Sequence, residues 1–280
     1  MFRIMIPLED LYTDVIAKAQ RGLSLSDETV AEKSGLPLRV VQRLKNGHPE
    51  RAPLARVAEV LDLHTDALIA LSEDRYRPEV TLPADGFAMI TTPYGGGMTV
   101  NAYVFWRREA RTAIAFDTGS TCSKILAAAK AAGSKIGMIF LTHTHPDHVA
   151  DLRRLRESTS APIFVGIEER LTEPKTIGMA PGSSSGAGPL QVRARSTPGH
   201  SPGGMTYVVE GLPERFAVVG DALFAGSMGG VAPELYAAAL KANRTQIFSL
   251  PDDTILCPGH GPLTTVGLEK ENNPFYAGRV

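Results

Sequence analysis

Near the middle of the chain stands the stretch Thr142-His143-Thr144-His145-Pro146-Asp147-His148, directly after the apolar run Ile136–Leu141. The apolar run predicts a strand. The first two histidines of the stretch stand two residues apart in an extended turn, so their side chains can point the same way. The aspartate and the third histidine follow where the chain enters a helix, whose first turn tolerates a carboxylate. Three imidazoles and a carboxylate at the C-terminal end of one strand indicate a metal site.

Three more predicted strands end in residues of the same kind. They are residues 192–197 before Pro198-Gly199-His200, residues 216–219 before Gly220-Asp221, and residues 254–257 before Pro258-Gly259-His260. Folds of the α/β type place their sites at the C-terminal ends of strands, so we expect the four segments to meet. Together they supply five imidazoles and two carboxylates, which are enough for two divalent metal ions. We predict a dinuclear site with the ligands His143, His145, Asp147, His148, His200, Asp221 and His260.

The ligand set also indicates the metals and the chemistry. Imidazole binds zinc, iron, manganese or cobalt, and carboxylates can bridge two ions. Zinc is the expected metal, with iron or manganese as alternatives. Asp221 is the natural bridge, because it ends a strand and small residues follow it. Two ions about 3.5–4 Å apart would hold a water as hydroxide near neutral pH and stabilise the oxyanion formed on attack. Asp147 can orient that water, so Asp147 and Asp221 are the candidate catalytic residues.

Other residues near these motifs have simpler explanations. Asp117 also ends a predicted strand, but its Asp-Thr-Gly sequence favours a turn residue that supports a ligand. Cys257 stands beside the last motif, where we expect a buried apolar thiol. His48 and His64 stand in a helical region without a partner motif, so we expect them to be structural.

Composition limits the class of protein. The chain has 280 residues, of which 43% are hydrophobic, so it can bury a sizeable core. The formal net charge of −1 argues against a generally basic nucleic-acid or membrane-surface protein. The two cysteines are too few for a disulfide framework and fit a reducing cytosol. No stretch has the roughly 20 apolar residues of a membrane helix, and the first ten residues do not resemble a signal peptide. We expect a cytoplasmic protein with no membrane partner.

The sequence changes character once along its length. Up to about Ser72 apolar residues recur three and four positions apart, which predicts helices. Residues 73–78 are charged and end in a proline, which is typical of a linker. After Ala84 short strands and turns predominate, with helices between some of them. We predict an α+β chain with a small all-α domain over residues 1–77 and a larger domain over residues 78–280.

The larger domain resembles the metallo-β-lactamase superfamily. The similarity lies in the stretch 142–148, Pro198-Gly199-His200, Gly220-Asp221 and Pro258-Gly259-His260-Gly261, and it covers about residues 84–276. The resemblance implies an αβ/βα sandwich with two metals between the edges of two sheets. By the family's pattern His143, His145 and His200 hold the first metal. Asp147, His148 and His260 hold the second, and Asp221 lies between the two ions.

Within that superfamily, residues 220–227 and 250–275 are most similar to glyoxalase II and its short bacterial relatives. True β-lactamases of the superfamily tend to lack a bridging aspartate, and persulfide dioxygenases use one iron. The loop Met228–Val231 and Gly261-Pro262 depart from glyoxalase II, which has a lysine and an aromatic residue there. The resemblance implies hydrolysis of a thioester or other small acyl ester, without a special role for glutathione. The alternatives are a lactonase, or a transcription regulator whose metal domain senses a ligand.

Residues 8–72 resemble the five-helix, Cro-repressor type of helix-turn-helix. The similar segments are residues 25–36, 40–47 and 54–61, with Gly35 at the turn and residues 37–46 as the helix that enters the major groove. This resemblance implies DNA as a partner, a homodimer, and Arg39, Gln42 and Arg43 as the residues that face DNA. The alternative is that the same helices serve only as a dimerisation module or as a lid over the substrate.

Overall fold

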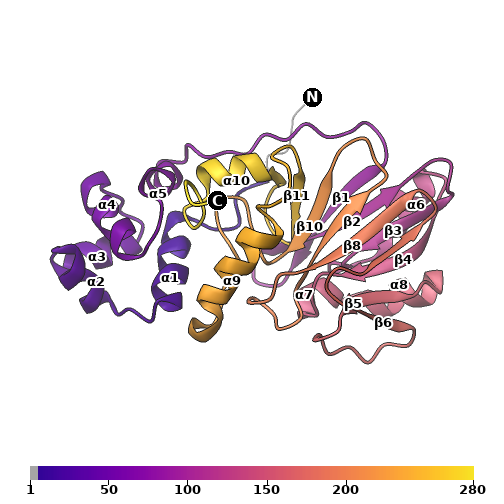
Figure 1. The fold of residues 1–280 in the computed structure, drawn as a ribbon, viewed down its shortest axis with the longest axis horizontal. Helices are drawn as coiled ribbons and strands as arrows, with labels where there is room; N and C mark the ends of the chain where they lie inside the picture. The colour runs from indigo at the N-terminus through magenta and orange to yellow at the C-terminus, as the bar shows by residue number, and fades with distance from the viewer. Residues whose placement is uncertain (1–5) are drawn as a thin grey trace.

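The computed structural model describes residues 6–280, and within them the chain begins with a group of short helices (Figure 1). These are α1 (Tyr12–Gly22), α2 (Asp27–Ser34), α3 (Leu38–Lys45), α4 (Arg51–Val60) and α5 (Thr65–Ser72). The predicted change of character at Ser72 is therefore found, because an extended segment follows α5 and leads to the first strand. His64 is the N-cap residue of α5, since its Nδ1 accepts a hydrogen bond from the backbone N–H of Ala67 at 3.3 Å.

The first sheet has six strands in sequence order. They are β1 (Phe87–Tyr94), β2 (Met98–Trp106), β3 (Thr112–Phe116), β4 (Lys135–Leu141), β5 (Ile163–Gly166) and β6 (Thr176–Met179). The pairs β1–β2 and β2–β3 are antiparallel, and the strands from β3 to β6 are parallel. Three helices follow strands of this sheet: α6 (Ser123–Ala131), α7 (Pro146–Val149) and α8 (Leu152–Thr159). Apolar residues of α6 and α8 cover the outer face of the sheet.

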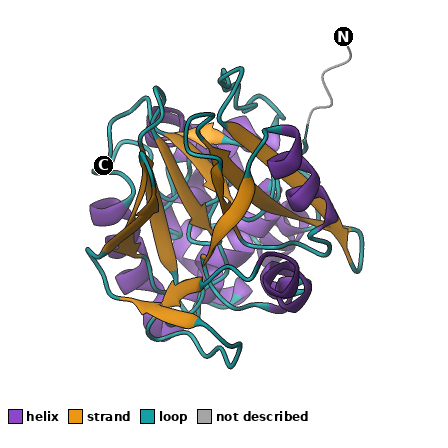
Figure 2. Cartoon of the chain, turned by 90° about the vertical axis from the view of Figure 1, so that its right-hand side faces the viewer, coloured by secondary structure: helices purple, strands orange, loops and turns teal. Residues whose placement is uncertain are grey.

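The second sheet has the order β12-β11-β10-β9-β8-β7. Its strands are β7 (Ser184–Ala187), β8 (Leu190–Ser196), β9 (Met205–Glu210), β10 (Phe216–Gly220), β11 (Ile255–Pro258) and β12 (Thr264–Thr265), with helices α9 (Pro233–Gln246) and α10 (Val266–Asn272). Only β10 and β11 run parallel. The two sheets face each other across a core in which Phe105 packs edge-on to Phe216 and Phe140 to Tyr207. Figure 2 shows the strands in the middle and helices around them, so the predicted sandwich is confirmed.

The N-terminal helices share a core with the second half of the chain. Helix α1 lies beside α9 (Figure 1). Val15, Ile16 and Ala19 of α1 belong to the same buried cluster as Val219 of β10 and Tyr236 of α9. The boundary expected near residue 77 falls in the extended segment after α5, and the division into two domains stays a prediction. Among residues 6–280 every helix is too short or too polar to cross a lipid bilayer.

Tyr76 ties the extended segment to the C-terminal part of the chain. Its hydroxyl donates to the buried carboxyl group of Glu269 in α10. Glu269 also accepts hydrogen bonds from Thr264 Oγ1 at 2.7 Å and from the backbone N–H of Gly226 at 2.9 Å. Burial raises the pKa of Glu269, so this carboxyl group depends on its hydrogen-bond donors.

Replacing Tyr76 with phenylalanine should lower the free energy of unfolding by about 1–3 kcal/mol, because the buried carboxyl group of Glu269 loses one of its hydrogen-bond donors. Urea unfolding of both proteins measures the change. Tyr94→Phe is the matched control: within residues 6–280 its hydroxyl makes no hydrogen bond, so we expect a change within about 0.5 kcal/mol. An equal loss in the two variants would contradict a role for the Tyr76–Glu269 hydrogen bond.

Candidate metal centre

The segments singled out in the sequence meet at one edge of the sandwich. Strand β4 of the first sheet ends at Leu141, and the histidine-rich stretch continues from it into α7. On the second sheet, β10 and β11 run parallel, so their C-terminal ends bring Asp221 and His260 to the same edge. His200 follows β8 in the loop before β9. The structure therefore brings all seven predicted ligand residues together, in three overlapping groups that could each hold a metal ion.

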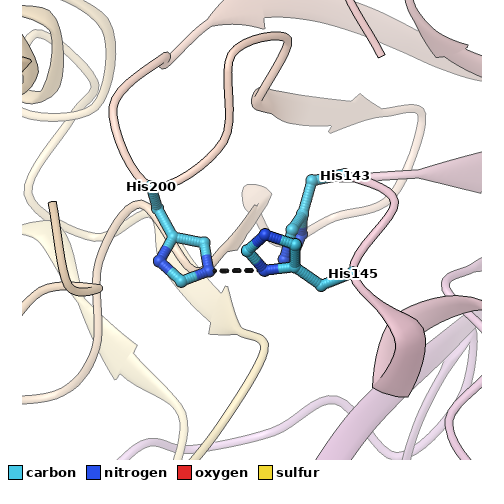
Figure 3. Close-up of side chains that lie close together, drawn as sticks. All are labelled: His143, His145 and His200. Carbon is cyan, nitrogen blue, oxygen red and sulfur yellow. Dashed lines mark hydrogen bonds between the residues drawn. The ribbon is translucent and has the colours of Figure 1, made fainter. Parts of the chain in front are cut away.

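His143, His145 and His200 form the first group, with ligand atoms within 4.8 Å of one another (Figure 3). His200 Nε2 lies 2.9 Å from His145 Nδ1, and Figure 3 shows the two rings pointing toward each other. Two of the other ring nitrogens contact residues outside this group. His200 Nδ1 lies 3.0 Å from the backbone oxygen of Gly230, and His143 Nδ1 lies 3.0 Å from Thr142 Oγ1. These contacts orient the rings so that the remaining nitrogens converge.

Asp147, His148 and His260 form the second group. Asp147 Oδ2 lies 3.2 Å from His260 Nε2 and 3.6 Å from His148 Nε2. His260 Nδ1 lies 2.6 Å from the backbone oxygen of Thr99, which fixes the orientation of this ring from the first sheet. The second group therefore combines a carboxylate and two imidazoles, whereas the first group consists of imidazoles alone.

Asp221 lies between the two groups. Its Oδ1 is 3.3 Å from His148 Nε2, and its Oδ2 is 3.4 Å from His200 Nε2 and 3.3 Å from His260 Nε2. The carboxylate thus contacts a member of the first group with one oxygen and members of the second group with both. A carboxylate in this position is placed to touch two cations.

The chemistry of this donor set fits two metal ions. His143 Nε2, His148 Nε2 and Asp221 Oδ1 are buried and have no hydrogen-bond partner within the described residues. Buried polar atoms are rarely left without a partner, and three of them converging on one spot indicate a cation there. Burial lowers the pKa of His143 and of His200, which favours the neutral imidazoles that bind metals.

The carboxylates act in the opposite direction on His148 and His260. Burial lowers the pKa of His148, but Asp221 and Asp117 outweigh it and raise that pKa to about 10. Burial is likewise outweighed at His260, where Asp147 and Asp221 raise the pKa to about 11. The carboxylates of Asp147 and Asp221 therefore stabilise positive charge on the neighbouring imidazoles. A bound metal ion would provide the positive charge that protonated His148 and His260 provide in its place.

Asp117 supports the site without belonging to any of the three groups. Its Oδ2 lies 2.9 Å from His148 Nδ1 and accepts a hydrogen bond from Thr142 Oγ1 at 2.8 Å, while its Oδ1 accepts one from the backbone N–H of Thr142 at 2.8 Å. One buried aspartate thus orients two neighbouring residues of the site. This agrees with the expectation that Asp117 is a supporting turn residue, and Cys257 is buried as expected.

Replacing Asp117 with asparagine should weaken metal binding about 10–100-fold, because the amide cannot orient the His148 ring as the carboxylate does. Zinc titration of the apo-protein with a competing chelator measures the affinity. The control is Asp252→Asn, which removes an exposed carboxylate that pairs with Lys270, and should leave the affinity unchanged. Equal zinc affinity in Asp117→Asn and the unmodified protein would show that Asp117 does not position a ligand.

Sequence reasoning missed the N-terminal residues beside the site. Glu9 contacts Gly261, because a Cβ atom added to Gly261 would lie 3.4 Å from the Cβ of Glu9. Asp10 accepts a hydrogen bond from Ser227 Oγ at 2.6 Å and forms an ion pair with Lys18. The same N-terminal segment lines a cavity of about 1290 Å³, whose other walls include Tyr76, Pro262 and Leu263. The contacts of Glu9 with Gly261 and of Asp10 with Ser227 join residues more than 200 positions apart, so no local pattern could reveal them.

The predicted DNA-facing residues lie elsewhere. Arg39, Gln42 and Arg43 are exposed on α3, which follows the left-handed turn at Gly35. Arg43 pairs with Glu50 at 3.2 Å. None of these side chains belongs to the groups that could hold a metal among residues 6–280.

Residues 95–260 match the model of a protein family described as the metallo-beta-lactamase superfamily. The chain belongs to this superfamily. It is 29% identical over 204 residues to a probable metallo-hydrolase, YqgX, of Bacillus subtilis, covering 65% of this chain and 95% of that protein. It is 26% identical to the hydroxyacylglutathione hydrolase GloC of Haemophilus influenzae, covering 62% of this chain and 92% of that one.

Two solved structures add to this comparison. The crystal structure of the B3 metallo-beta-lactamase BLEG-1 has 30% sequence identity and a TM-score of 0.56, covering 69% of this chain and all of that one. The crystal structure of TTHA1623 in a di-iron-bound form has 28% identity and a TM-score of 0.53, covering 67% and 99%. The superfamily match begins at residue 95, so it leaves the N-terminal helices outside.

Proposed function

We propose that this chain is a dinuclear metal-dependent hydrolase of small acyl thioesters. The observation that carries the proposal is the position of Asp221 between two groups of ligand atoms. In this proposal His143, His145 and His200 hold one ion, Asp147, His148 and His260 hold the other, and Asp221 contacts both. The likeness to a hydroxyacylglutathione hydrolase supports a thioester as the substrate. Zinc suits the imidazole-rich donor set, and the di-iron form of TTHA1623 supports iron as the alternative.

Two divalent ions bound there would supply Lewis acidity toward a carbonyl oxygen and a water that is nucleophilic near neutral pH. Asp147 Oδ2 belongs to the second group and lies 3.2 Å from His260 Nε2, where it could accept a hydrogen bond from such a water and orient it. Asp117 fixes the orientation of the His148 ring through its contact with Nδ1. A thiol has a pKa of about 8.5, so a thiolate can leave without strong protonation. The carboxylates of Asp147 and Asp221 both contact imidazoles, so neither is a separate general acid for the leaving group. A thioester, whose thiolate leaves without protonation, therefore suits this site.

The test is a panel of acyl esters measured with the zinc-loaded protein. We expect hydrolysis of small acyl thioesters, and a preference for glutathione over simple thiol carriers of less than about a hundredfold, roughly 2.7 kcal/mol. The reason is that Gly230 and Gly261-Pro262 offer no polar side chain with which to hold the tripeptide. A lactone and a β-lactam belong in the same panel, and faster turnover of either would overturn the thioester proposal.

We also propose that α3 binds DNA as part of a homodimer. The supporting observation is that Arg39, Gln42 and Arg43 are all exposed, while Val41 and Leu44 hold the other face of the helix in the core. Arginine pairs with guanine and glutamine with adenine, each worth about 1–3 kcal/mol of discrimination. Lys45 adds little, because it pairs with Asp27 at 2.5 Å.

Selection of bound sequences from random duplexes at low salt tests the DNA proposal. We expect one enriched motif with half-sites about one helical turn apart, and its loss in Arg39→Ala and Gln42→Ala. Sedimentation of the free protein measures whether it is a dimer. If no motif is enriched, the helices do not read DNA.

A further inference from the structure

Helix α1 presents two cationic side chains, Lys18 and Arg21, to the loop that follows Asp221. The two residues are three positions apart, so they lie on the same face of the helix. Lys18 Nζ donates to the backbone oxygen of Met228 at 2.8 Å and forms an ion pair with Asp10. It also lies 5.0 Å from the centre of the Phe224 ring, which packs edge-on to His260. The charge of Lys18 is thus compensated, and its role is to hold the loop.

Arg21 has no such compensation. Its side chain is exposed, and none of the ion pairs formed within residues 6–280 includes it. A Cβ atom added to Gly230 would lie 3.7 Å from Arg21 Nη1. Gly230 is also the residue whose backbone oxygen contacts His200 Nδ1 at 3.0 Å. The guanidinium therefore stands next to the backbone that orients one of the proposed metal ligands.

The packing of α1 fixes this arrangement. Val15, Ile16 and Ala19 have at most 1% of their surface exposed. Gly22 stands directly against α9, because a Cβ atom there would lie only 2.4 Å from ring carbons of Tyr236. Moving α1 away would open the shared core, so the packing holds the backbone of Arg21 in a fixed position next to Gly230.

We propose that Arg21 binds a carboxylate of the substrate, so that the N-terminal helix forms part of the substrate-binding site. This inference rests on the proposed thioester hydrolysis. A guanidinium matches a carboxylate geometrically and can donate two parallel hydrogen bonds to it. Two divalent ions and an unpaired guanidinium repel one another, and a bound anion between them would relieve that repulsion. The substrate class is a small acyl thioester with a carboxylate on its acyl part or on its thiol carrier.

A simpler role for Arg21 would be to complement the dipole at the C-terminal end of α1. Lys33 has the equivalent position in the last turn of α2 and is also exposed. Lys33→Ala is therefore the matched control, because it removes a cation from a helix C-terminus away from the metal centre. Arg21→Lys keeps the charge but loses the planar donor pair.

The experiment compares three thioesters on the zinc-loaded full chain. The neutral reference is the acetyl thioester of N-acetylcysteamine. The acetyl thioester of N-acetylcysteine adds a carboxylate to the carrier, and the succinyl thioester of N-acetylcysteamine adds one to the acyl part. We expect the unmodified protein and Lys33→Ala to prefer one of the two charged compounds in kcat/KM by about tenfold. Arg21→Ala should lose this preference through a higher KM for the charged compound, and Arg21→Lys should keep part of it.

A binding measurement separates this inference from the proposed activity. Calorimetry gives the Kd of N-acetylcysteine, of N-acetylcysteamine and of succinate for the same proteins. If no thioester is hydrolysed, yet a carboxylated compound binds the unmodified protein about tenfold more tightly than it binds Arg21→Ala, the hydrolase proposal fails and Arg21 is still an anion site. Equal handling of charged and neutral compounds by the unmodified protein, or by Arg21→Ala and the unmodified protein alike, overturns the inference.

Discussion

Replacing Asp221 with asparagine should lower the metal content from about two ions per chain to one or fewer, and hydrolysis by at least about a thousandfold, roughly 4 kcal/mol. Asparagine keeps the size of the side chain but removes its charge. The carboxylate lies 3.3–3.4 Å from nitrogens of His148, His200 and His260, so both groups of ligands lose their shared anion. Two cations that share one anionic ligand repel each other more strongly once that ligand is neutral.

Elemental analysis of the purified proteins measures the occupancy, and thioester hydrolysis measures the activity. Asp253→Asn is the control, because that carboxylate is exposed, pairs with Arg215 and lies outside the site. Full occupancy together with full activity in Asp221→Asn would contradict a dinuclear site. Loss of activity with both ions retained would instead show that Asp221 acts on the substrate or on the water.

The positions of the candidate ligands could be predicted because they depend on local sequence. Each ligand follows a strand within four residues or lies in the short helix α7, and strand ends are marked by the change from apolar residues to glycine, proline and histidine. Once β10 and β11 pair in parallel, Asp221 and His260 must meet at the same edge. Local sequence patterns therefore predict the ligand positions and the edge of the sandwich at which they meet.

The packing of the N-terminal helices could not be predicted in the same way. A periodic pattern shows that α1 has an apolar face, but not which surface covers that face. In the structure Tyr236 of α9 and Val219 of the second sheet belong to the same buried cluster as Val15 and Ile16 of this face. The sequence alone predicts a separate helical module joined by a charged linker. The linker is not free, because Tyr76 within it is buried and bonded to Glu269.

The repeated Pro-Gly-His sequence has a physical reason that the pattern alone did not reveal. A Cβ atom added to Gly259 would lie 2.1 Å from Asp221 Oδ1 and 2.6 Å from His148 Cε1. At Gly199 it would lie 2.4 Å from the Cβ of Ala239. The glycines before His200 and His260 thus allow the backbone to approach the site and α9 more closely than any side chain permits.

Gly259→Ala should therefore disrupt the metal centre although it adds only one methyl group. The methyl must displace Asp221 or His148, which are buried and cannot move aside without disturbing Asp117 and the neighbouring ligands. Overpacking of this kind costs about 1–3 kcal/mol, and here the displaced atoms are proposed ligands, so we expect loss of at least one metal ion and about a hundredfold or more of activity. Gly95→Ala is the matched control: a Cβ atom there has no neighbour within 4 Å, so metal content should not change. Circular dichroism shows whether both variants fold, and a folded Gly259→Ala that keeps two ions would mean that the ligand atoms converge less tightly than the structure shows.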